Sequence, residues 1–186
     1  MKEFFKMSVG KITGVICGSF YRDLLIRGIL VKSNYRTMVW GRSSEEFMPC
    51  ALIPLRYGCN LIELFEDCER YFDTLIIDCL HDYFDVENVK KFLQWIKKNE
   101  KAKQKTILII FKQKSDIYDD TKCDKLDAFV NLKKDIVMCC DHLYSLTRDG
   151  GFAEREYWLT NLHTGAKKKM VHQDGYVQGF FKNVLD

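Results

Sequence analysis

Residues 74–78, Thr-Leu-Ile-Ile-Asp, constrain the fold more than any other stretch of the sequence. Four residues suited to a β-strand are followed by one carboxylate, between a polar segment (66–73) and an amphipathic one (86–98). Such an uninterrupted run predicts a strand that is buried on both faces, as in the middle of a parallel sheet. Sheets of this kind bind ligands at the carboxyl ends of their strands, which is where Asp78 is expected.

The length and composition favour one globular domain. The chain has 186 residues, of which 47% are hydrophobic, so it can bury a full core. The formal net charge of +3 is too small to predict a nucleic-acid partner by its sign. Because no apolar window is long enough to cross a membrane, we expect an intracellular protein. The eight cysteines are then expected to be reduced, with Cys17, Cys79, Cys139 and Cys140 in the core.

The first two thirds of the chain alternate between expected strands and helices. The clearest helix is at residues 86–98, where apolar side chains recur at helical spacing and lysines occupy the other face. A further helix after Ser43 or Ser44 is expected to be short or irregular because of Pro49 and Pro54. The remaining predictions are strands at 11–17, 36–41, 59–65, 74–78 and 106–111, and helices within 20–32 and at 126–134.

The pattern changes after residue 134, where strands follow one another without a helix between them. The predicted fold class is therefore α/β, with a mostly parallel sheet flanked by helices and antiparallel hairpins at the carboxyl-terminal end. We expect a single domain (1–186), with a tail (1–10), a parallel part (11–134) and an antiparallel part (135–186). The strands of the last part are predicted at 135–140, 142–148, 154–162 and 167–172, with turns at 149–151 and 164–165.

This order of elements resembles the core of the RecA-type ATPases, the group that includes RecA, KaiC and the DnaB-type helicases. The resemblance rests on the strand, turn and helix at 11–32, the strand that ends at Asp78, and a later strand followed by Gln113. The basic hairpins and the closing Asp-Gly-Tyr-Val at 174–177 also match. The resemblance covers most of the chain and implies a RecA-like core.

The chain departs from that family at the phosphate-binding loop. A P-loop needs G-x-x-x-x-G-K-[ST], because backbone N–H groups wrap the phosphates, the lysine reaches the terminal ones and the hydroxyl holds magnesium. Here no lysine follows Gly18, two aromatic residues occupy the space of the phosphates, and Gly41 stands where the family has its catalytic glutamate. We therefore predict no cofactor and no ATP hydrolysis by this chain alone. The residues of the degenerate nucleotide site are Gly14, Gly18, Ser19, Arg22, Asp78 and Gln113.

A short RecA-type core without a working P-loop is similar to the divergent accessory paralogues of the eukaryotic recombinase, of the Shu-complex kind. This resemblance implies a related RecA-fold protein as heterodimer partner, contact with a recombinase filament and with single-stranded DNA, a role in homologous-recombination repair, and nuclear localisation. One alternative is a small ATPase or nucleotide switch of the KaiC or DnaB type with an unorthodox phosphate site. Another is an interaction module on an ordinary doubly wound sheet.

Several side chains have both a functional and a structural interpretation. Asp78 is either a relic of a metal site or a carboxylate that holds a neighbouring turn or strand, and Gln113 either relays nucleotide state or is merely polar at a strand end. Clustered lysines can neutralise phosphates, although a charged run is more often a solvated surface, as we expect for residues 97–105. The candidate nucleic-acid contacts are Lys112, Lys114, Arg148, Lys167, Lys168 and Lys169.

Aromatic residues near the start of the chain suggest a partner interface, with simple burial as the alternative. The candidates are Phe4, Phe5, Phe20 and Tyr21. Zinc binding by Cys79 with His81, or by Cys140 with His142, has little support because no C-x-x-C pair occurs. Catalysis by Cys79, His81 and Asp82 is disfavoured because neighbours on a strand point apart.

Overall fold

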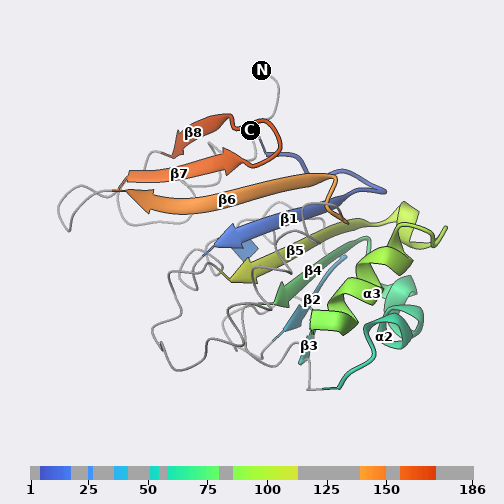
Figure 1. Ribbon diagram of the computed structural model, residues 1–186. Coiled ribbons are helices and arrows are strands. Elements are labelled where there is room, and N and C mark those ends of the chain that lie inside the picture. The colour runs from blue at the N-terminus through green and yellow to red at the C-terminus, as the bar shows by residue number, and fades with distance from the viewer. Residues whose placement is uncertain are drawn as a thin grey trace.

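The computed structural model describes residues 5–17, 25–26, 36–41, 51–54, 58–79, 86–112, 139–149 and 156–170. They form one sheet of eight strands in the order β3-β2-β4-β5-β1-β6-β7-β8, with two α-helices against one face of the sheet (Figure 1). The strands are β1 (Ile12–Cys17), β2 (Thr37–Gly41), β3 (Ala51–Pro54), β4 (Thr74–Cys79), β5 (Thr106–Lys112), β6 (His142–Asp149), β7 (Glu156–Asn161) and β8 (Lys167–Met170). The helices are α2 (Leu61–Cys68) and α3 (Val86–Ile96), with short 3-10 turns η2 (Glu69–Tyr71) and η3 (Ala102–Gln104).

The sheet has the predicted division into a parallel and an antiparallel part. Strands β3, β2, β4, β5, β1 and β6 pair in parallel, whereas β7 is antiparallel to both β6 and β8. The strand predicted at residues 74–78 is β4, which lies between β2 and β5. Its residues Leu75, Ile76 and Ile77 are at most 1% exposed, so the prediction of a strand buried on both faces is confirmed.

The core between the sheet and the two helices is built around aromatic rings. Trp40 on β2 contacts Phe65 of α2 and Phe92 of α3, with ring centroids 6.5 Å and 5.9 Å apart. Phe72 completes the cluster with its ring edge toward Trp40. All four side chains are at most 1% exposed, and burial of each large apolar side chain contributes about 2–3 kcal/mol. This cluster fixes α2 and α3 over β2, β4 and β5.

One predicted strand is wrong: residues 59–65 contain the start of α2. The side chain of Asn60 accepts hydrogen bonds from the backbone N–H groups of Ile62 and Glu63 and so caps the helix. Leu61 and Phe65 are four residues apart and face the core together, as helical spacing requires. The short apolar run allowed either structure, and the asparagine was the signal that favoured a helix.

The third strand lies instead at β3, in a stretch where an irregular helix was expected. β3 pairs only with β2 and stands at the end of the described sheet. A proline is tolerated on an edge strand because one side of the strand has no ladder partner, which explains Pro54 at this position.

The strand predicted at residues 135–140 is not supported where it is described. Cys139 is helical, Cys140 belongs to no strand, and β6 begins only at His142. Leu25 and Ile26 are helical, as expected for the helix within 20–32. Residues 42–50, where the helix after Ser43 or Ser44 was expected to begin, and the helix predicted at 126–134 lie outside the described residues. Within the described ranges, none of the helices is both long and apolar enough to span a membrane.

Candidate site at the carboxyl ends of the parallel strands

The parallel topology brings the ends of four neighbouring strands to one edge of the sheet. β2 ends at Gly41, β4 at Cys79, β5 at Lys112 and β1 at Cys17, and the arrowheads of these strands point the same way in Figure 1. This is the edge at which open α/β sheets bind ligands. The predicted site residues Gly18, Ser19, Arg22 and Gln113 follow these ends in sequence but lie outside the described residues.

Asp78 occupies the last-but-one position of β4, at this edge of the sheet. Its side chain is only 2% exposed, and it pairs across the ladder with Ile110 of β5. On the other side lies Gly41, where an added Cβ would be 2.8 Å from the Cβ of Asp78 and 3.2 Å from Oδ2. The glycine at the end of β2 therefore leaves the space that the carboxylate fills.

Gly14 has a packing role within β1. It pairs with Ile109 of β5 and Leu143 of β6, so it lies inside the sheet and not in a loop. An added Cβ would be 2.7 Å from Leu143 Cδ1 and 2.8 Å from Cys140 Sγ. Gly14 is thus required for close packing of the core, and any loop at this end of β1 begins after Cys17.

The predicted basic residues fall into separate groups. Lys112 ends β5 and Arg148 lies near the end of β6, both at the carboxyl edge. Lys167, Lys168 and Lys169 lie on β8, which is four strands from β5 and so about 19 Å away. Alternation along β8 places Lys167 and Lys169 on one face and Lys168 on the other. Lys114 lies outside the described residues.

Phe5 is packed within its own chain. Its side chain is 2% exposed, and its ring lies 4.9 Å from the ring of Tyr144. The adjacent Lys6 donates its backbone N–H to Tyr144 Oη, and its carbonyl accepts from Thr13 Oγ1. For Phe5 this packing favours the alternative of simple burial over a partner contact, because a ring that fills this core position is covered by its own chain. Phe4, Phe20 and Tyr21 lie outside the described residues.

The cysteine and histidine candidates do not form a ligand set in the described ranges, where no group of three or more His, Cys, Asp or Glu side chains is placed to hold a metal. Burial, with smaller effects of Cys139 and Asp141, raises the pKa of the Cys140 thiol to about 12. Burial also lowers the pKa of His142. His81, Asp82 and the side chain of Cys79 are not described.

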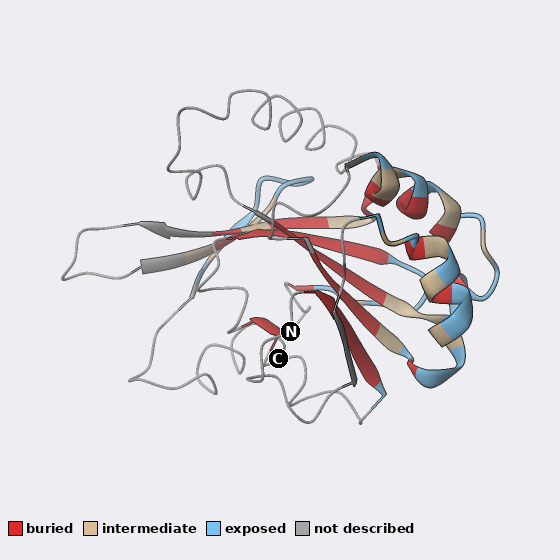
Figure 2. Cartoon of the chain, turned by 90° about the horizontal axis from the view of Figure 1, so that it is seen from below, coloured by how far each residue is buried: buried red, intermediate tan, exposed pale blue. Residues whose placement is uncertain are grey.

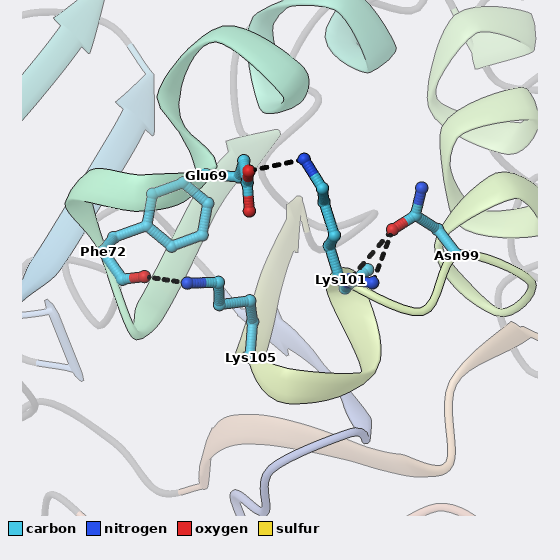
Figure 3. A network of polar contacts seen from close by, with 6 residues as sticks. Glu69, Phe72, Asn99, Lys101 and Lys105 are labelled. Carbon is cyan, nitrogen blue, oxygen red and sulfur yellow. Dashed lines mark hydrogen bonds and ion pairs between the residues drawn. The ribbon is translucent and has the colours of Figure 1, made fainter.

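A polar network lies at the opposite edge of the sheet, where the parallel strands begin (Figure 3). The sequence pattern did not predict it. Lys101 Nζ lies 2.7 Å from Glu69 Oε1, and Lys105 Nζ donates to the carbonyl of Phe72 at 2.6 Å. The hydrogen bond from Lys101, together with the charges of Lys101, Lys105 and Arg70, lowers the pKa of Glu69. Two lysines of the run at 97–105, expected to be merely solvated, thus join η3 to η2 and to the start of β4.

Comparison with known proteins bears on the fold. Neither a family model nor a curated protein sequence matches this chain. Among solved structures, the chain is similar to the flagellar accessory protein FlaH from Methanocaldococcus jannaschii, with a TM-score of 0.51 and 11% identity over 82% of this chain and 78% of that chain. FlaH has a RecA-like fold, so the sheet of this chain is RecA-like as well. At this level of identity the similarity concerns the fold alone.

Proposed function

We propose that this RecA-like chain is a non-catalytic subunit that pairs with a related protein and assists the assembly or remodelling of a recombinase filament on single-stranded DNA. The related protein would supply the phosphate-binding loop, and any nucleotide would lie between the two subunits. The proposal draws its biological setting, homologous-recombination repair in the nucleus, from the resemblance to the divergent recombinase paralogues.

The sequence that follows β1 carries the non-catalytic part of the proposal. All six residues of Ile12–Cys17 are buried, and the strand lies between β5 and β6. A phosphate loop wraps its ligand with consecutive backbone N–H groups, and groups inside a central strand already belong to the sheet ladder. The five residues that follow, Gly-Ser-Phe-Tyr-Arg, contain no lysine to reach a phosphate.

Equilibrium dialysis of the isolated chain against ATP and magnesium tests this proposal. We expect no bound nucleotide and no hydrolysis, and measurable hydrolysis would overturn the proposal. Co-purification from native extract tests the partner, because the proposal requires recovery of a RecA-type ATPase with the chain.

A second candidate function is a small ATPase or nucleotide switch of the KaiC or DnaB type. The observation that favours it is the buried carboxylate of Asp78 at the carboxyl end of a central strand, where P-loop ATPases hold magnesium. If the dialysis shows bound ATP, the Asp78→Asn variant distinguishes the non-catalytic subunit from the ATPase or nucleotide switch. Loss of magnesium-dependent binding in this variant would favour the second function.

A further inference from the structure

The amino edge of the sheet, where the parallel strands begin, concentrates positive charge. We define the amino edge as the described residues directly before β1 (8–11), β2 (36), β4 (69–73), β5 (97–105) and β6 (139–141). These strands are neighbours, so the edge extends over about 19 Å. It holds eight cations and four carboxylates, whereas the whole chain has a net charge of only +3. The cations are Lys11, Arg36, Arg70, Lys97, Lys98, Lys101, Lys103 and Lys105.

Each carboxylate of the amino edge forms an ion pair, and the edge still has more cations than carboxylates. Each carboxylate lies within 4 Å of one cation, in the pairs Lys11–Asp141, Arg36–Asp73, Lys101–Glu69 and Lys103–Glu100. Cations still outnumber carboxylates two to one. Seven of the eight cations are exposed and Lys105 is half-buried, so most of this charge is accessible to solvent. The segments that join the helices to the strands, on the right of Figure 2, are largely coloured as exposed. Polyanions are the ligands that such a surface attracts.

An exposed aromatic ring lies among these cations. Tyr71 is 56% exposed, and the guanidinium of Arg70 lies 4.7 Å from its ring centroid. Arg36 donates to the carbonyl of Arg70 and so supports this turn from β2. An aromatic face beside a guanidinium offers a stacking surface to an unpaired base.

A cavity of about 370 Å³ lies further along the same edge. Its inner wall is apolar, and its rim carries three of the cations and one carboxylate. A volume of this size is sufficient for a small ligand group. The wall is formed by Ile12, Ile96, Ala102 and Ile107, and the rim by Lys11, Lys97, Lys103 and Asp141.

We propose that the amino edge is a second binding surface for single-stranded nucleic acid, with phosphates along the cations and bases against Tyr71 and in the cavity. This surface is separate from the lysines of β8 and does not depend on the function proposed above. Insertion into a membrane would need a continuous exposed apolar face, whereas this edge exposes only Val9 and Tyr71 as large hydrophobic side chains. An acidic peptide would satisfy the charges but would leave the aromatic ring without a matching group.

Fluorescence anisotropy of a labelled oligothymidylate with the full chain, over a range of KCl concentrations, tests this proposal. For the double variant Arg70→Gln/Lys103→Gln, we plot the logarithm of the association constant against the logarithm of the KCl concentration. The magnitude of this slope is expected to fall by about 1.4, since each phosphate contact contributes about 0.7 to it. The control Lys90→Gln/Lys91→Gln removes the same charge from α3, away from the amino edge, and should leave the slope unchanged. All four side chains are at least partly exposed, so folding is expected to persist.

The tyrosine gives an independent readout. Tyr71→Ala should weaken oligothymidylate binding about tenfold without changing the salt slope, and Tyr71→Phe should retain it. Equal salt slopes for the two double variants, or unchanged affinity of Tyr71→Ala, would overturn the proposal. The proposal would also be overturned if the Arg70→Gln/Lys103→Gln and Tyr71→Ala variants lost as much affinity for polyglutamate or for anionic vesicles as for oligothymidylate. Lys167–Lys169 are unchanged in every variant. A loss of binding in these variants therefore comes from the amino edge and not from the DNA contacts proposed for β8.

Discussion

The backbone of Gly41 lies directly against the side chain of Asp78, at the carboxyl ends of the adjacent strands β2 and β4. A Cβ on residue 41 would be 2.8 Å from the Cβ of Asp78 and 3.2 Å from its Oδ2. Because Asp78 is 2% exposed, it cannot move away into solvent. The position of this carboxylate therefore depends on the absence of a side chain at residue 41 of the neighbouring strand.

Gly41→Ala is expected to destabilise the chain by about 1–3 kcal/mol, because the new methyl group overpacks a buried site. Urea unfolding measures the change. Val9→Ala is the control, since Val9 is 67% exposed and its truncation should change the free energy of unfolding by less than about 0.5 kcal/mol. Equal stability of Gly41→Ala and the native chain would contradict the contact.

Phe5→Ala is expected to destabilise the isolated chain by about 3 kcal/mol, because the buried ring leaves a cavity next to Tyr144. Phe5→Leu should cost less, since it retains most of the apolar volume. The measurement is the free energy of unfolding without any partner. If Phe5 instead served only a neighbouring subunit, the alanine variant would unfold like the native chain.

Lys105→Met is expected to cost about 1–2 kcal/mol, because it removes the half-buried hydrogen bond to the carbonyl of Phe72 while keeping the apolar stem. Lys103→Met is the matched variant, since it loses only a surface ion pair with Glu100 and should cost less than about 0.5 kcal/mol. Urea unfolding of both proteins measures the difference. Similar values for the two variants would show that the network in Figure 3 contributes little.

Stability is expected to fall as the pH drops below about 6.5, through His142. Burial lowers the pKa of this side chain from 6.5; nearby Lys6, His163 and Lys11 add to the effect, and Asp141 opposes it. The unfolded chain therefore takes up this proton at a higher pH than the folded chain, so the loss continues until the folded pKa is reached. His142→Gln should reduce the loss in urea unfolding. His163→Gln should reduce it much less, because His163 makes only a minor contribution to the lowered pKa of His142. An unchanged pH dependence in His142→Gln would reject the assignment.

Charge reversal on β8 tests the DNA contact of the proposed function. Lys167 and Lys169 share one face of the strand, so Lys167→Glu/Lys169→Glu should lower the salt slope for a single-stranded oligonucleotide by at least about 1.4. Lys168→Glu lies on the opposite face and should have a smaller effect. An unchanged slope in the double variant would count against this surface.

The sequence by itself determined the central strands and the clearest helix. Residues 74–78 and 106–111 are short runs rich in β-branched and apolar residues, which favour strands buried on both faces, and the apolar stripe of α3 has helical periodicity. It also determined the change from parallel to antiparallel pairing, because the last strands have no helix between them. The run at 59–65 was ambiguous, because its apolar residues suit either period and tertiary packing with Trp40 selected the helix.

Only the tertiary structure decided which side chains meet. The contact between Gly41 and Asp78 depends on β2 pairing with β4, which no local pattern specifies. The order of the strands likewise separates Lys112 from the lysines of β8, and it gathers the cations of the amino edge from four segments that are separate in the sequence. Local propensities act over a few residues, whereas a site is formed by strand order, which the packing of the whole sheet determines.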